Sequence, residues 1–85
     1  MPGSSQTKRS VTVAGHRTSL SLEDIFWEEL KAWAAEENLS LNALVSQLDE
    51  GRQTNLSSCL RVAVLRRLQD RLAEQEAKAK RLPTA

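Results

Sequence analysis

Hydrophobic and polar residues alternate along residues 17–22, and this alternation predicts a short β-strand. The segment reads RTSLSL, so residues of one kind recur at every second position. Successive side chains of a strand point to opposite faces of the sheet. One face then carries Thr18, Leu20 and Leu22, and the other carries Arg17, Ser19 and Ser21. Because no second strand of matching length follows, we expect this strand to pair with its own copy in a second chain.

Helical periodicity replaces the alternation after this strand. Ser21 and Asp24 have the spacing of a capping box, with Asp at the position where Glu or Gln is usual. The following apolar residues recur at helical spacing and form one stripe: Phe26, Leu30, Trp33 and Ala34. The second tryptophan, Trp27, is expected in the core or at a dimer contact. Asn38 can adopt a left-handed conformation, so the helix is predicted to end near Glu37.

Two more helices are predicted downstream. Ser40 is placed to cap a helix with an apolar stripe of Leu41, Leu44, Val45 and Leu48, and Gly51 ends or bends it. A third helix is expected from about Asn55 and is predicted to fray before Pro83. Its stripe repeats every four residues: Leu56, Leu60, Val64, Leu68 and Leu72, widened by Leu65.

The N-terminal segment is predicted to be divided into two parts. Residues 1–9 resemble a flexible basic arm because they offer nothing to bury. Residues 10–16 alternate again, and they either extend the strand or form a hairpin arm that folds back on residues 17–22. The pattern leaves both options open. The expected division is an arm over 1–9, a core over 10–52, an amphipathic helix over 53–82 and a tail over 83–85.

Composition fits one small helical domain. The chain has 85 residues, of which 40% are hydrophobic and 27% are charged, with a net charge of +1. The charges are unevenly placed: residues 1–19 carry three bases and no acid, whereas residues 23–37 carry six acids and one base. Residues 61–85 are basic again, with seven bases and three acids. A polyanionic partner would therefore meet basic ends and an acidic middle.

Few residues suit metal binding or catalysis. A single cysteine, Cys59, excludes an intrachain disulfide and is expected as a buried thiol on a helix in a reducing cytosol. His16 is the only histidine, which argues against a zinc site. No cofactor, membrane span or signal peptide is expected, and we expect a cytoplasmic protein that is not an enzyme.

The run SLSLEDIFWEELKAWAAEENLSLNALV resembles the ribbon-helix-helix family of DNA-binding proteins, the β-ribbon readers of the MetJ and Arc class. The string KRSVTVAGHRTSLSLEDIFWEEL resembles a bacterial branch of that family with an added C-terminal helix. This resemblance implies a mainly α homodimer with one short strand per chain and an intermolecular two-stranded antiparallel β-ribbon. It implies a shared dimer core made of Leu20, Leu22, Phe26, Leu30, Trp33, Leu44, Val45 and Leu48.

The resemblance also implies the contacts with double-stranded DNA. The ribbon enters the major groove, where Arg17, Ser19 and Ser21 read base edges. A phosphate is bound by backbone N–H groups at the start of the second helix, which are those of Ser40, Leu41 and Asn42. Independently of the family, Lys8 and Arg9 of the arm are candidates for phosphate contacts. The plainer interpretation of the polar strand face is the solvent side of an edge strand.

Three functions follow from these expectations. The first is a bacterial transcriptional repressor or autoregulator that associates with the nucleoid when bound. The second is the antitoxin of a toxin–antitoxin pair, in which residues 55–82 bind the toxin. The third is a scaffold that uses the dimer and the last helix only for protein contacts.

Overall fold

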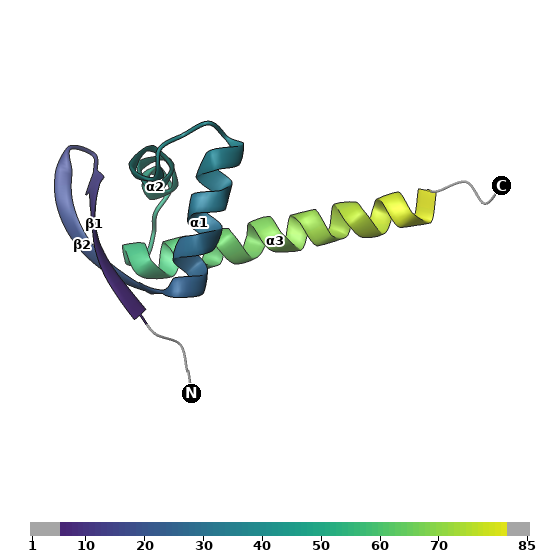
Figure 1. Cartoon of the computed structure of the whole chain (residues 1–85), viewed down its shortest axis with the longest axis horizontal. Helices are drawn as coiled ribbons and strands as arrows, with labels where there is room; N and C mark the ends of the chain where they lie inside the picture. The colour runs from purple at the N-terminus through teal and green to yellow at the C-terminus, as the bar shows by residue number, and fades with distance from the viewer. Residues whose placement is uncertain (1–5, 82–85) are drawn as a thin grey trace.

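A β-hairpin packs against two short helices and the start of a long third helix (Figure 1). The computed structural model describes residues 6–81, with side chains described as far as residue 79. The elements are β1 (Gln6–Val13), β2 (His16–Glu23), α1 (Asp24–Glu36), α2 (Leu41–Glu50) and α3 (Leu56–Arg81). This order confirms the expected ribbon-helix-helix architecture with an added C-terminal helix. No helix in this part of the chain is long and apolar enough to cross a membrane.

The hairpin settles the choice that the sequence left open. β1 pairs antiparallel with β2 over its whole length, from Gln6 opposite Glu23 to Val13 opposite His16. The expectation of one strand per chain is therefore wrong, because the first partner of β2 is β1 of the same chain. The flexible arm is also wrong for residues 6–9, which form the first half of β1; residues 1–5 lie outside the described residues.

A two-residue turn connects the strands. Ala14 has φ 52° and Gly15 has φ 80°. Two successive positive φ values define a type I′ turn, whose twist matches that of the flanking strands. Glycine adopts this conformation without strain, whereas the Cβ of Ala14 opposes it.

The ends of α1 differ in how well the sequence predicts them. The helix starts one residue after Glu23, which has extended backbone angles and no side-chain capping hydrogen bond, so the expected capping box of Ser21 and Asp24 does not form. At the other end Asn38 has φ 58°, and the N–H of Leu39 donates to the carbonyl of Ala34 at 2.8 Å. This is a Schellman-type end with Asn in the position that glycine usually takes.

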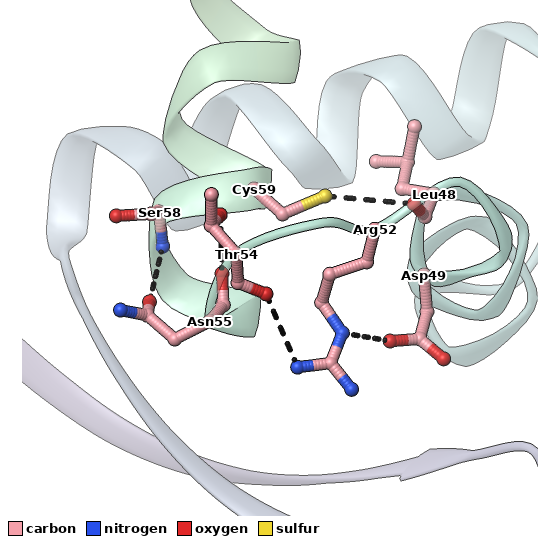
Figure 2. A network of polar contacts seen from close by, with 7 residues as sticks. All are labelled: Leu48, Asp49, Arg52, Thr54, Asn55, Ser58 and Cys59. Atoms are coloured by element: carbon pink, nitrogen blue, oxygen red, sulfur yellow. Dashed lines mark hydrogen bonds and ion pairs between the residues drawn. The ribbon is translucent and has the colours of Figure 1, made fainter.

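Side-chain caps begin both α2 and α3. The Ser40 hydroxyl accepts a hydrogen bond from the N–H of Ala43 at 3.0 Å, as predicted. The side chain of Asn55 accepts from the N–H of Ser58 at 2.8 Å (Figure 2). In the same network Arg52 is paired with Asp49 at 2.7 Å and donates to the carbonyl of Thr54. These contacts fix the connection between the two helices.

The core lies between the inner face of the hairpin and the three helices. Its buried residues come from every element: Val11, Val13, Leu20, Leu22, Trp27, Leu30, Ala34, Leu44, Val45, Leu60 and Val64. Of the expected dimer core, Phe26, Trp33 and Leu48 are only partly buried and pack against this cluster. A single chain therefore covers most of the residues that the family resemblance assigned to a shared core.

The expected stripe of α3 is buried only in its first part. Leu60 and Val64 are buried, but Leu68 and Leu72 are 40% and 59% exposed. Figure 1 shows α3 continuing well beyond the other elements. Cys59 is half-buried, and its thiol lies 3.5 Å from the carbonyl oxygen of Leu48. The expected fraying before Pro83 and the tail over 83–85 fall outside the described residues.

Candidate nucleic-acid interface

The outer face of the hairpin carries two parallel rows of polar side chains. On β2 these are Arg17, Ser19 and Ser21, as the sequence predicted. The register places Thr12, Ser10 and Lys8 of β1 directly opposite them. The hairpin thus adds a second polar row that residues 17–22 alone do not contain.

Burial of the opposite face fixes which side chains point outward. Leu20 and Leu22 of β2 are 5% and 0% exposed, and Val11 of β1 is 2% exposed. Because a shift of one residue would exchange the two faces, this apolar set locks Arg17 and the two serines on the outside. The polar face is therefore a consequence of core packing.

The outer face carries two bases, Lys8 and Arg17, and one acid, Glu23, at its end. Glu23 is paired with Arg61 of α3 at 2.9 Å. Gln6 also donates to Glu23 at 3.1 Å. The Arg61 guanidinium, together with a backbone N–H and the Gln6 amide, lowers the pKa of Glu23 from its ordinary value of 4.5. The Glu23 carboxylate is therefore ionised at neutral pH, and it accepts hydrogen bonds from Arg61 and Gln6.

Lys8 and Arg9, which the sequence suggested as a pair, lie on opposite faces of β1. The guanidinium of Arg9 is placed over the ring of Trp27, 5.6 Å from its centre. Trp27 in turn donates from its indole nitrogen to the carbonyl of Thr7 at 2.8 Å. Arg9 thus belongs to the packing of β1 on α1, whereas Lys8 shares the outer face with Arg17.

Helix α2 is hydrogen-bonded to the backbone of β1 at Thr12. The N–H of Thr12 donates to the side chain of Asn42 at 3.2 Å, and the hydroxyl of Ser46 donates to the Thr12 carbonyl at 3.3 Å. Leu41 and Asn42 are the first residues of the helix, so their N–H groups have no carbonyl one turn earlier to bind. The start of α2, where the phosphate site is predicted, therefore lies beside the edge of β1 at Thr12.

These same contacts show how the backbone of the hairpin is oriented. In a two-residue hairpin the residues that flank the turn bind each other, so backbone groups point alternately toward and away from the partner strand. Thr12 points away from β2 and meets α2. By the same alternation, the N–H and C=O groups of Arg17, Ser19 and Ser21 point away from β1. Within residues 6–81 no strand pairs with this outer edge of β2.

Other kinds of site find no support in the described residues. No group of three or more His, Cys, Asp or Glu side chains is placed to bind a metal within residues 6–81.

The sequence alone did not reveal the contacts of Arg61 with Glu23 and of Arg9 with Trp27. The partners are 38 and 18 residues apart, and neither pair has a local spacing signal.

Comparisons with known proteins agree with this arrangement. A family model described as a ribbon-helix-helix domain matches residues 6–68. Among solved structures, an uncharacterized protein from Bordetella pertussis Tohama I is similar, with 32% sequence identity and a TM-score of 0.68. The match covers 84% of this chain and 61% of that chain, so this chain spans less than two thirds of its length. No curated protein matches.

The family model begins at the first residue of β1 and ends within α3, so it includes the hairpin and all of α1 and α2. The domain supports a DNA-binding or regulatory role at the level of the family, whose fold is typically not enzymatic. With more than half of its length matched by this domain, the chain belongs to the ribbon-helix-helix family.

Proposed function

We propose that this chain is a homodimeric, sequence-specific binder of double-stranded DNA that acts as a bacterial transcriptional repressor or autoregulator at the nucleoid. The main observation in support of this proposal is that β2 combines a polar outer face with an outer edge that is unpaired within residues 6–81. Both properties belong to the same three residues, Arg17, Ser19 and Ser21. The side chains can meet bases while the backbone groups pair with a second copy.

Two copies of β2 can pair antiparallel around Ser19. This register places Arg17 opposite the serine at position 21 of the other copy, and it uses the outward backbone groups of all three residues. A shift that brought the two Arg17 side chains opposite each other would be disfavoured, because like charges directly across a strand pair repel. The intermolecular ribbon thus remains the proposal, with β1 as an additional flanking strand on each side.

A four-stranded sheet of this kind divides the DNA contacts between its strands. Neighbouring strands lie about 4.8 Å apart, so the two outer strands are separated by about 14 Å. The major groove is about 12 Å wide, which suits the central pair. We therefore assign base contacts to β2 and phosphate contacts to β1, where Lys8 supplies a cation and Ser10 and Thr12 supply hydroxyl groups.

Arg17 supplies most of the base discrimination in this proposal. A guanidinium can donate to O6 and N7 of guanine together, whereas the hydroxyls of Ser19 and Ser21 accept several bases. The backbone N–H groups at Ser40, Leu41 and Asn42 bind a phosphate beside the groove, favoured by the helix dipole. We assign no direct phosphate contact to Arg9, because its guanidinium is placed over Trp27.

Selection of bound fragments from random duplex DNA tests the proposal. The full chain should enrich sites with two-fold symmetry, because a symmetric dimer reads two equivalent half-sites. A matched selection with Arg17→Ala should lose enrichment at one position of each half-site. No enrichment by the wild-type dimer over a range of salt concentrations would overturn the proposed function.

A further inference from the structure

A set of apolar side chains on α1 and α3 is left exposed by the residues that the structure describes. Ile25 is 65% exposed, and Val62, Leu65, Leu68 and Leu72 are between 40% and 59% exposed. The α3 members recur at intervals of three and four residues, so they share one side of the helix. Together these five residues form what we call the α3 ridge.

The ridge borders a groove between α1 and α3. This groove has a volume of about 340 Å³ and is lined by Ile25, Phe26, Glu29, Arg61, Val62, Val64, Leu65 and Leu68. Single exposed apolar residues are ordinary, but a contiguous set beside an apolar groove indicates an interaction surface.

The far end of α3 has no packing partner among residues 6–79. Arg67 and Arg71 are paired with Glu36 at 2.6 and 3.1 Å, which fastens the middle of the helix to the end of α1. Residues 72–79 are all exposed, and in Figure 1 this part of α3 lies away from the other elements. A helical segment this short is only marginally stable in water without packing.

The position of the groove indicates its occupant. The backbone of α2 lies closest to β1 among the strands, whereas those of α1 and α3 lie closest to β2. The Arg61 side chain lines the groove and also binds Glu23 at the end of β2. The groove therefore adjoins the end of β2. We infer that a second chain paired with the outer edge of β2 would lie close to this groove.

We propose that a second copy of this chain covers the α3 ridge, so that the homodimer is joined by its helices as well as by β2. An isologous two-fold interface buries the same surface patch of both chains, so the apolar ridge of one copy can pack against the ridge of the other. The inference rests on the homodimer of the proposed function and assigns α3 to it.

Charge substitutions on the ridge test this assignment without DNA. Leu65→Glu and the double variant Leu65→Glu/Leu68→Glu should raise the dimer dissociation constant at least tenfold in sedimentation. Ala77→Glu puts the same charge on the far side of the exposed helix and should leave the constant unchanged. Both ridge positions are largely exposed, so circular dichroism of the variants should match that of the wild type.

A second measurement needs no variant. Hydrogen exchange at residues 65–76 of the full chain should slow as the protein concentration rises through the dimer dissociation constant. An intact dimer of the double variant, or exchange that is independent of concentration while β2 becomes protected, would overturn the inference and leave the proposed function standing. If the wild-type dimer is intact but does not bind DNA selectively, the proposed function is overturned and the inference about α3 stands.

Discussion

Arg61 of α3 forms two hydrogen bonds with the carboxylate of Glu23 at the end of β2. Its Nε lies 2.9 Å from one oxygen of Glu23, and a terminal nitrogen lies 3.3 Å from the other. This two-point contact joins the added helix to the base of the ribbon. Because Arg61 also lines the groove between α1 and α3, the same side chain contacts both the end of β2 and the groove.

The free energy of unfolding should fall at acidic pH, because Glu23 and Glu36 are both paired with arginines. Hydrogen bonds from Arg61 lower the pKa of Glu23, and hydrogen bonds from Arg67 lower that of Glu36. A carboxylate with a lowered pKa in the folded state contributes stability that is present above its ordinary value of 4.5 and is lost as the pH falls through the folded-state pKa. Urea unfolding between pH 6 and 2.5 should show this loss.

Glu23→Gln should reduce the acid dependence, and Glu23→Gln/Glu36→Gln should reduce it further. Glu28→Gln changes an exposed acid of α1 and serves as the control, with an acid dependence like that of the wild type. Equal slopes in all four proteins would show that the ion pairs do not contribute to the pH dependence.

Sequence specificity should depend on Arg17. Arg17→Ala is expected to cost about 1–3 kcal/mol of binding to a selected site and to relax the preference at one base position. Competition gel shifts with matched and scrambled duplexes measure both effects. Ser21→Ala is a matched change on the same face, and its smaller loss would support the larger role of the guanidinium; unchanged selectivity of Arg17→Ala would refute that role.

Lys8 should affect every DNA sequence alike. Each phosphate contact contributes about 0.9 to the slope of log affinity against log salt, so Lys8→Ala should reduce the slope by about 2 for a dimer. Arg9→Ala should change the slope little and lower stability instead, because it removes the contact with Trp27. Salt titrations and thermal unfolding of the two variants separate these roles. Equal slope changes would place both cations at the DNA.

The turn offers a test of the hairpin itself. Ala14 has φ 52°, a conformation that costs an L-residue about 1–2 kcal/mol. Asparagine tolerates this region and is preferred at the first turn position before glycine. Ala14→Asn should therefore raise the free energy of unfolding by roughly 1 kcal/mol. A lower unfolding midpoint for this variant would argue against a type I′ turn.

The sequence predicts the elements of this fold better than their contacts. Helix periodicity and the cap at Ser40 are local signals, and the structure confirms them. The cap at Asn55 is a finding of the structure that the sequence had not indicated. The hairpin was ambiguous because its Ala-Gly turn lacks the usual Asn-Gly signature. In α1 the apolar residues fit two adjacent stripes, and packing buries Trp27 while Trp33 remains half-buried.

Long-range pairing explains most of what the sequence could not predict. The core had been assigned to two chains, but β1 and the first part of α3 supply Val11, Val13, Leu60 and Val64 from within the chain. Likewise, the separation of Lys8 from Arg9 follows only from the strand alternation of β1, which the flexible-arm prediction did not contain. The polar face of β2 was predictable because it depends only on the alternation within residues 17–22.

A disulfide trap at Ser19 tests the central pairing most directly. In a Cys59→Ser background, Ser19→Cys should form an intermolecular disulfide under mild oxidation, because directly paired Cα atoms about 5.5 Å apart suit this bond. Ser10→Cys in the same background places its thiol on the flanking strand and should not cross-link. Rapid cross-linking at position 19, and not at position 10, is the predicted result. Cross-linking at position 10 but not at position 19, in a chain that is dimeric by sedimentation, would contradict the account.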